Sequence, residues 1–288
     1  MGPASVIKVR MLRRIGFLWH FGHFFHDFLM PMNDYLETAR PDRGQKMHVV
    51  LFGAAQSKRP FDNYAPRLLK RDDFLGDFKH IAEKFLNIEV RYEYGMPFEK
   101  RHNRLVRLRA YDFGPYSPES FIRLNRVADL VYGSSICNKN TPVILIERGH
   151  KPLVASRSGH EWAMTGSAIR SISNHSMLRD AMQARYGDNF ANVVLESLSF
   201  EEQIALFRGA KIIVGQHGAG LCNIAWVARR GATVLELPPV RFATFQHMCE
   251  AKGLDYKVIY KKWVKQAPAP CPVDVDQVMS LLPDLRAF

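Results

Sequence analysis

Between residues 142 and 239 the chain alternates short apolar runs, rich in β-branched residues, with segments of helical periodicity. The apolar runs have the length and composition of buried strands, and they cover residues 142–148, 192–197, 211–216 and 232–239. Helical periodicity occurs at residues 173–187 and 199–210, and the second segment opens with the capping-box pair Ser199 and Glu202. Strands and helices that alternate with short loops form a parallel sheet covered by crossover helices. We therefore predict an α/β fold.

The first half of the chain shows the same kinds of segment at less regular spacing. Strand patterns occur at residues 47–55, 87–94 and 104–113. Helix patterns occur at residues 15–36, where Pro31 interrupts an aromatic face, at residues 75–86, and from Ser117 onward, where Pro118 suits the first helical position. This half is also predicted to be an α/β domain.

Polar, turn-rich residues 134–142 separate the two halves. We predict an N-terminal acceptor-side domain at residues 1–138 and a C-terminal Rossmann-like domain at residues 139–270. A Pro-rich connector leads into the last segment, residues 271–288, whose helix could pack back on the N-terminal domain. Two such domains would enclose a cleft, and ligands of open α/β sheets bind at the carboxyl ends of the strands.

Charge and cysteine usage narrow the class of protein. Among the 288 residues, 40 Lys and Arg against 28 Asp and Glu leave a net charge of +12, which favours anionic partners. Cysteines without a CxxC pair are typical of reduced thiols in a cytosolic protein, and here they are Cys137, Cys222, Cys249 and Cys271. No apolar run reaches the roughly 18 residues of a membrane span. We expect a cytoplasmic protein without a membrane span.

A glycine-rich loop, GQHGAGLCN, follows the third of the strands in the second half. Gly215, Gly218 and Gly220 lack a Cβ atom and let the backbone approach a ligand closely. A helix that begins here would direct unpaired N–H groups at an anion, and His217 adds a neutral donor or a cation. The loop alone leaves ligand binding and a tight structural turn both open. Glu236, at the end of the next strand, could bind ribose hydroxyls or simply lie exposed.

Residues 143–239 resemble glycosyltransferase family 61. The hallmark of that family is a strand, the sequence HGAGL followed by Asn, an apolar turn, Gly-Ala and a strand that ends in Glu. The matching residues here are His217, Gly218, Ala219, Gly220, Leu221, Asn223, Gly231, Ala232 and Glu236, in that order. HGAG by itself is a weak motif, whereas the ordered set of elements is specific.

Three further elements of the family lie upstream of the loop. They are a strand that ends in Ser-Arg, the pattern Arg-x-x-x-Asn at the start of a helix, and a helix that contains Glu-Gln. The matching residues are Arg148, preceded by Glu147 in place of the serine, then Arg170 with Asn174, then Glu202 with Gln203. The insert before Arg170 is longer than usual, so Arg157 competes with Arg148 as the first arginine.

The N-terminal half resembles the family more loosely. The family commonly carries His-x-x-x-Asp/Glu before an early helix, and His23 and Asp27 have this spacing. Residues four apart share a helix face, where an aspartate can orient a histidine and raise its basicity. The resemblance implies that this pair activates the acceptor hydroxyl. His20 and His26 are alternatives as the base, and simple packing of these histidines in an aromatic helix also remains open.

The resemblance implies a GT-B-like fold of two Rossmann-like domains and an inverting transfer from a UDP-sugar to a glycan hydroxyl, with xylose favoured over N-acetylglucosamine. Charge that builds on the departing diphosphate needs fixed donors or a metal, and arginine binds phosphate well. The expected nucleotide-sugar site is Arg148, Arg170, Asn174, His217, Gly218, Ala219, Gly220, Asn223 and Glu236. We expect no divalent metal and no other cofactor, because the Asp-x-Asp triplet at residues 274–276 suits a helix N-terminus.

Two other functions are compatible with the sequence. A catalytically inactive family member would share every motif. A basic nucleic-acid-binding protein would fit the net charge of +12 and the run KRHNRLVRLR at residues 100–109. A strand with one basic face explains that run, and it lacks an aromatic RNA-binding motif, so we expect no specific nucleic acid partner.

Overall fold

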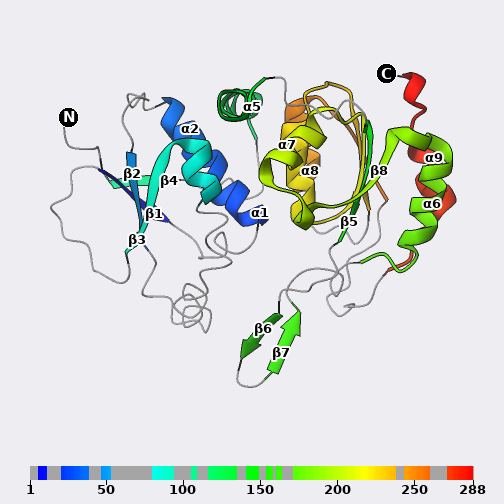
Figure 1. Cartoon of the computed structure of the whole chain (residues 1–288), viewed down its shortest axis with the longest axis horizontal. Coiled ribbons are helices and arrows are strands. Elements are labelled where there is room, and N and C mark those ends of the chain that lie inside the picture. Colours follow the sequence, from blue (N-terminus) through cyan, green and yellow to red (C-terminus); the bar gives the residue numbers. More distant parts are fainter. Residues whose placement is uncertain are drawn as a thin grey trace. The chain divides into compact units, whose positions relative to one another are not determined.

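The computed structural model describes residues 6–11, 21–38, 47–52, 80–93, 105–108, 116–134, 141–148, 154–157, 160–163, 171–237, 243–259 and 271–287. The chain divides into two compact units, Met1–Ser134 and Ser135–Phe288. Each unit is built on a parallel sheet with helices (Figure 1). The predicted α/β fold with two Rossmann-like units is confirmed.

The first unit contains a four-stranded sheet in the order β3-β2-β1-β4, and all its neighbouring strands are parallel. Its strands are β1 (Val6–Met11), β2 (Met47–Phe52), β3 (Ile88–Glu93) and β4 (Leu105–Leu108). Three of them confirm predicted strands, with shorter bounds. Strand β1 was not predicted, because Lys8 and Arg10 make its six residues unlike a buried parallel strand. The order is that of the first four strands of a Rossmann sheet.

One helical segment follows β1 and precedes β2 along the chain. It consists of α1 (Phe21–His23), the π-helix η2 (Phe24–Leu29) and α2 (Met30–Thr38). Pro31 cannot donate to the carbonyl of residue 27, and its ring crowds that carbonyl. A wider π-turn just before the proline relieves this crowding. The predicted helix at residues 15–36 is confirmed where it is described, and its aromatic side chains Phe24, Phe25 and Phe28 are buried.

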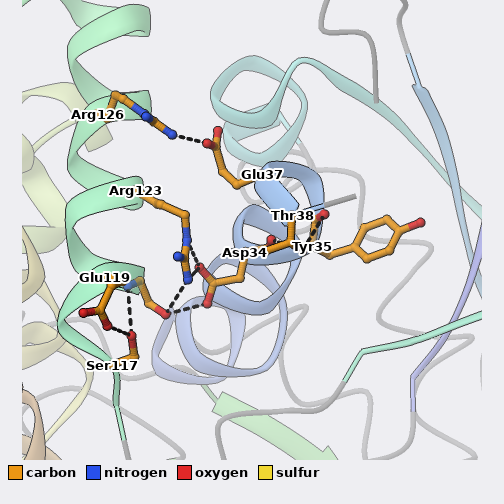
Figure 2. A network of polar contacts seen from close by, with 9 residues as sticks. Asp34, Tyr35, Glu37, Thr38, Ser117, Glu119, Arg123 and Arg126 are labelled. Atoms are coloured by element: carbon orange, nitrogen blue, oxygen red, sulfur yellow. Dashed lines mark hydrogen bonds and ion pairs between the residues drawn. The ribbon is translucent and has the colours of Figure 1, made fainter. Parts of the chain in front are cut away.

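Helix α5 (Pro118–Tyr132) begins as predicted, with Ser117 as N-cap and proline in the first turn. It packs against α2, and two ion pairs link the helices: Asp34 with Arg123, at 2.7 Å between Oδ1 and Nη2, and Glu37 with Arg126 (Figure 2). The two acidic residues are three positions apart on α2, and the two arginines are three positions apart on α5. The two ion pairs therefore lie about one helical turn apart. Residues 80–86 form a shorter helix within the predicted segment at residues 75–86.

The second unit contains a five-stranded parallel sheet in the order β11-β10-β9-β5-β8. Its strands are β5 (Val143–Glu147), β8 (Phe190–Val194), β9 (Ile212–Gln216), β10 (Thr233–Leu237) and β11 (Asp255–Val258). Strands β5, β9 and β10 confirm predicted strands. The strand predicted at residues 192–197 is confirmed at residues 192–194, whereas residues 195–197 form a 3₁₀ helix. Strand β11 was not predicted. Counted along the chain, this is the 2-1-3-4-5 order, in which the connections reverse direction between β5 and β9. The carboxyl ends of these two strands are therefore where a ligand is expected.

Helices cover both faces of this sheet (Figure 1). On one side lie α7 (Phe200–Arg208) and α8 (Thr244–Lys252), and on the other lie α6 (His175–Tyr186) and α9 (Val275–Leu281). The predicted capping box of Ser199 and Glu202 is present at the start of α7. Helix α9 packs on α6, and Val278 belongs to the core of the second unit. Helix α8 was not predicted.

The remaining elements of the second unit are short. Strands β6 (Val154–Arg157) and β7 (His160–Ala163) form an antiparallel hairpin in the insert that precedes Arg170. The 3₁₀ helices are η5 (Gly187–Asn189), η6 (Leu195–Ser197), η7 (Ala219–Trp226) and η8 (Leu285–Ala287). Among the described residues, no helix is both long and apolar enough to cross a bilayer.

Candidate active site

The HGAG loop begins at the carboxyl end of β9 and continues into η7. Packing explains Gly215, which lies within β9, and Gly220, which lies within η7. A Cβ atom on Gly215 would lie 3.0 Å from Cδ1 of Ile146, and one on Gly220 would lie 3.0 Å from Cδ1 of Leu195. Such contacts are tighter than ordinary van der Waals contact, so a larger residue would push the chain away from Ile146 of β5 or from Leu195 of η6. These glycines hold the loop close to the sheet.

Arg148 comes directly after β5 and reaches across to the loop. Its Nη2 atom donates to the main-chain carbonyl of His217 at 3.0 Å. A Cβ atom on Gly218 would overlap the same guanidinium, which explains the third glycine. The structure thus brings Arg148, His217 and Gly218 together where β5 and β9 end, at the reversal of strand order.

Behind the loop, His217 contacts Glu236 of β10, and Glu236 in turn contacts Tyr256 of β11. The Nδ1 atom of His217 bonds to Oε1 of Glu236, and Oε2 of Glu236 accepts from the hydroxyl of Tyr256 at 2.5 Å. Glu236 is fully buried, with 0% of its surface exposed, so the alternative of an exposed strand-end carboxylate is excluded. Burial and the Glu236 charge raise the pKa of Tyr256, and its hydroxyl therefore remains a donor.

Helix α8 closes this region from one side. The ring of Phe245 stands edge-on to the His217 imidazole, with 5.3 Å between the ring centroids. Burial raises the pKa of the Cys249 thiol, which is therefore inert as a nucleophile. Lys252, at the last turn of α8, donates from Nζ to the carbonyl of Ala225 at 2.9 Å, and burial lowers its pKa to about 8. Phe245 thus gives the His217 ring an apolar neighbour on the side of α8.

Asn223 is fully buried and bonds to protein groups through both ends of its amide. Its Nδ2 atom donates to Oε1 of Gln203 at 3.0 Å and to the carbonyl of Gly220 at 3.2 Å, and its Oδ1 atom accepts from Trp226. Gln203 in turn donates to the carbonyls of residues 195 and 198. Gln203 of the Glu-Gln element and the loop asparagine therefore form one network that ties α7 to η7.

Asn174 occupies the start of α6, where its side chain bonds twice to the backbone of Val273. Nδ2 donates to the carbonyl at 2.8 Å, and Oδ1 accepts from the amide at 3.0 Å. The asparagine thus fastens the segment that leads into α9. Arg170 lies outside the described residues, and so does the side chain of Arg157, whose backbone ends β6. Ala219 is the first residue of η7.

The expected catalytic pair lies on the helical segment of the first unit. His23 ends α1 and Asp27 lies within η2, but their side chains, like all of His20, lie outside the described part of the chain. His26 is 2% exposed, and its Nδ1 atom is 3.0 Å from the hydroxyl of Tyr116. The packed-histidine alternative therefore describes His26.

The Asp-x-Asp triplet at residues 274–276 lies at the start of α9. Asp274 caps α9, where its Oδ1 atom accepts from the amide of Gln277 at 3.0 Å. This is the helix N-terminal placement that the sequence predicts. Within the described part of the chain, no three His, Cys, Asp or Glu residues are grouped as metal ligands would be.

Three comparisons with known proteins bear on this site. A plant protein, the beta-1,2-xylosyltransferase of Arabidopsis thaliana, is 26% identical over 125 residues, which are 43% of this chain and 21% of that protein. The chain thus matches about a fifth of the length of this relative. The E. coli heptosyltransferase WaaC with ADP aligns over 96% of both chains, with a TM-score of 0.36 and 11% identity. The sequence profile of the family Glycosyltransferase 61 matches residues 21–235, most of the chain, and the protein therefore belongs to that family.

Proposed function

We propose that this protein is an inverting glycosyltransferase that moves a sugar from UDP to a glycan hydroxyl without a divalent metal. Membership of family 61 supports the reaction class. The observation that carries the proposal is the bond from Arg148 to the carbonyl of His217, because it assembles a cation and a glycine loop at the carboxyl ends of β5 and β9. That is the place where α/β sheets bind phosphorylated ligands.

Charge neutralisation is the main task of such a site. As the bond between sugar and diphosphate breaks, negative charge develops on the β-phosphate, and donors that are already in place stabilise it without reorganisation. Arg148 is held by the loop and supplies a guanidinium, the cation that binds phosphate most specifically. We propose that Arg148, His217 and Arg170 carry this role. Gly218, Ala219 and Gly220 would line the approach of the diphosphate.

Asn223, Asn174 and Glu236 take a different part in this proposal. Their polar atoms bond to protein groups, so they shape the nucleotide-sugar site by holding the loop, the start of α6 and His217. Tyr256 joins them through Glu236.

The donor and the base complete the proposal. Xylose is the favoured sugar, and the name of the plant relative supports it; N-acetylglucosamine is the next candidate. The acceptor hydroxyl must lose a proton, and we assign this step to His23 and Asp27. The bond between His26 and Tyr116 supports this choice, because it occupies one ring nitrogen of the nearest rival.

The test is ligand binding followed by transfer, both in EDTA. UDP should raise the melting temperature, whereas NAD and duplex DNA should not, and UDP-xylose should be turned over with a glycan acceptor. Arg148→Ala should weaken UDP binding about tenfold or more. Arg179→Ala is the matched control, because Arg179 lies exposed on α6 and pairs with Asp180. A strict requirement for Mn²⁺, or equal UDP affinity in the two variants, would refute the proposed mechanism.

A further inference from the structure

Gln216, the last residue of β9, carries a buried carboxamide directly before the HGAG loop. The residue is 6% exposed, and its Oε1 atom is buried without a hydrogen-bond partner in the described part of the chain. Most buried polar atoms are paired, because an unpaired one has lost its water and gained nothing in return. An unpaired acceptor at the carboxyl end of this strand, where α/β sheets bind ligands, indicates that a ligand supplies the missing donor.

The Gln216 side chain lies on the α6 side of the sheet. Side chains alternate between the two faces of a strand, so Gln216 shares its face with Val214. Leu237 lies opposite Gln216 in the register of β9 and β10. Val214 and Leu237 belong to the apolar core under α6 and α9, which also contains Ile172 and Val273 (Figure 1). Gln216 therefore has apolar neighbours on its own strand and on β10.

The neighbouring strand β5 provides a polar comparison. Glu147 ends β5 as Gln216 ends β9, and the register of the two strands puts these residues at matching positions. Oε2 of Glu147 accepts from Nδ2 of Asn192, and Oδ1 of Asn192 bonds to Nε2 of His175 at 2.9 Å. The polar side chains at β5 and β8 thus bond to one another, whereas Oε1 of Gln216 has no such partner among the described residues.

The chemistry of the unpaired oxygen selects the part of the ligand that meets it. An amide oxygen only accepts, so its partner must carry an N–H or O–H group. The ionised phosphates of UDP carry neither. Uracil presents an N–H between two carbonyl oxygens on one flat edge, and a carboxamide can meet such an edge with two parallel bonds, as glutamine does with base edges in nucleic acids. The apolar faces of the base also suit the apolar neighbours of Gln216, whereas each hydroxyl of a sugar would need a polar partner.

We propose that Gln216 binds the uracil edge of the nucleotide, with Oε1 accepting from the ring N–H and Nε2 donating to a ring carbonyl. This inference rests on the proposed function, in which the loop that follows Gln216 binds the diphosphate. Without nucleotide, the protein bears the cost of an unpaired buried oxygen, and the base removes that cost when it binds. Local costs of this kind are typical of functional sites, where stability is lost in favour of binding.

Gln216→Leu removes both polar ends of the side chain and keeps its volume approximately. The variant should bind UDP about three- to tenfold more weakly in calorimetric titration. Without ligand it should melt about 2–4 °C above the wild type, because the unpaired buried oxygen is gone. A side chain with a purely structural role would lower the melting temperature instead. Inorganic pyrophosphate, which has no base, should bind both proteins equally.

The diphosphate of 3-methyluridine tests the same contact from the side of the ligand. Its methyl group replaces the ring N–H, so the wild type should bind it at least about three- to tenfold more weakly than UDP. UDP-xylose should lose the same factor as UDP in Gln216→Leu. Gln246→Leu is the matched control, because the Gln246 carboxamide lies exposed on α8 and bonds to Glu250. Its UDP affinity and melting temperature should equal those of the wild type.

The outcomes separate this inference from the proposed function. The inference is overturned by unchanged UDP affinity or a lowered melting temperature in Gln216→Leu, by a parallel loss of pyrophosphate affinity, or by a loss confined to UDP-xylose. Equal wild-type affinity for UDP and its 3-methyl derivative would also overturn it. In each of these cases the wild type still binds UDP, and the proposed function stands. A wild-type protein that binds neither UDP nor pyrophosphate would refute the proposed function, and the inference with it.

Discussion

Nη2 of Arg148 lies 3.0 Å from the carbonyl oxygen of His217, and this bond joins the ends of β5 and β9. The bond requires a residue without a Cβ atom at position 218, because a Cβ atom on Gly218 would occupy the position of the guanidinium. Arg148 and Gly218 are therefore a matched pair, in which the glycine leaves room for the arginine. This relationship gives the first prediction.

Gly218→Ala should lower UDP affinity about tenfold and leave stability almost unchanged, within about 0.5 kcal/mol. The backbone at Gly218 is extended, with φ 169°, which any residue adopts, and the obstructing atoms are the end of a flexible side chain. The arginine is thus displaced while the fold is kept. Calorimetric UDP titration and urea denaturation measure the two effects.

Gly231→Ala should have the opposite effects, a loss of stability with unchanged UDP affinity. Gly231 is exposed and has φ +75°, and nothing lies within 4 Å of an added Cβ atom. The strained backbone should cost about 1–2 kcal/mol of unfolding free energy, while UDP affinity stays as in the wild type. If Gly218→Ala binds UDP normally, the pairing of this glycine with Arg148 has no functional meaning.

Asn223→Ala should lower the free energy of unfolding by about 2–4 kcal/mol. The change removes the partner of the Trp226 indole and of the Gln203 carbonyl group, and both are left without their bonds in a buried region. Gln246→Ala is the control, because it breaks one bond to Glu250 on the exposed face of α8 and should cost less than about 0.5 kcal/mol. Equal urea midpoints for the two variants would contradict the structural role of Asn223.

Asn223 also shows how much of the fold and of the site could be predicted from the sequence. Strands β5, β9 and β10 and the capped helix α7 were predictable because their signals are local: β-branched runs, and a serine three residues before a glutamate. Motif order brought Arg148 and His217 into one expected site. It could not distinguish a side chain that meets a ligand from one that holds the loop, because that distinction depends on burial and on long-range partners.

Tyr256 was missed for a related reason. Strand β11 has the four residues DYKV, two of them charged, and its residues are exposed or half-buried. Such a short polar edge strand resembles a loop in the sequence. The contact of Tyr256 with Glu236 appears when β11 aligns beside β10.

The π-helix before Pro31 was also not predicted. It results from the competition between helical hydrogen bonding and proline geometry, which the periodicity of the sequence does not show.

The ion pairs between α2 and α5 should contribute unequally to stability. Asp34 accepts from Nε and Nη2 of Arg123 and from the Ser120 hydroxyl, and the Asp34 side chain is 18% exposed. Arg126, which pairs with Glu37, is 58% exposed, whereas the Glu37 side chain is 8% exposed. Asp34→Ala removes the bonds from Arg123 and Ser120 and should cost about 1–3 kcal/mol, and Arg126→Ala, which removes one partner of Glu37, should cost about 0.5–1 kcal/mol.

A double-mutant cycle isolates the pair itself. Asp34→Ala, Arg123→Ala and the double variant should give a coupling free energy of about 1 kcal/mol in thermal or urea unfolding. The corresponding cycle for Glu37 and Arg126, whose arginine is 58% exposed, serves as the reference and should give a smaller coupling free energy. A larger coupling for Glu37 and Arg126 than for Asp34 and Arg123 would contradict this ranking.

Lys252 should make stability depend on pH in the alkaline range. Burial lowers its pKa in the folded state from 10.5 to about 8. Between these values the unfolded chain binds a proton that the folded chain does not, so the free energy of unfolding rises with pH across this window. Below pH 8 both states bind the proton, and the unfavourable burial of the ammonium is then fully present.

The measurement compares the wild type with Lys252→Met, which keeps the length of the side chain and removes the titration. The difference in unfolding free energy, wild type minus variant, should increase by about 1–3 kcal/mol between pH 8 and pH 10.5. Tyrosine and thiol groups titrate in the same range, but their contributions cancel in the difference where both proteins share them. A difference that stays flat, or that falls with pH, would mean that the bond from Nζ to Ala225 keeps Lys252 charged in the folded state at little cost.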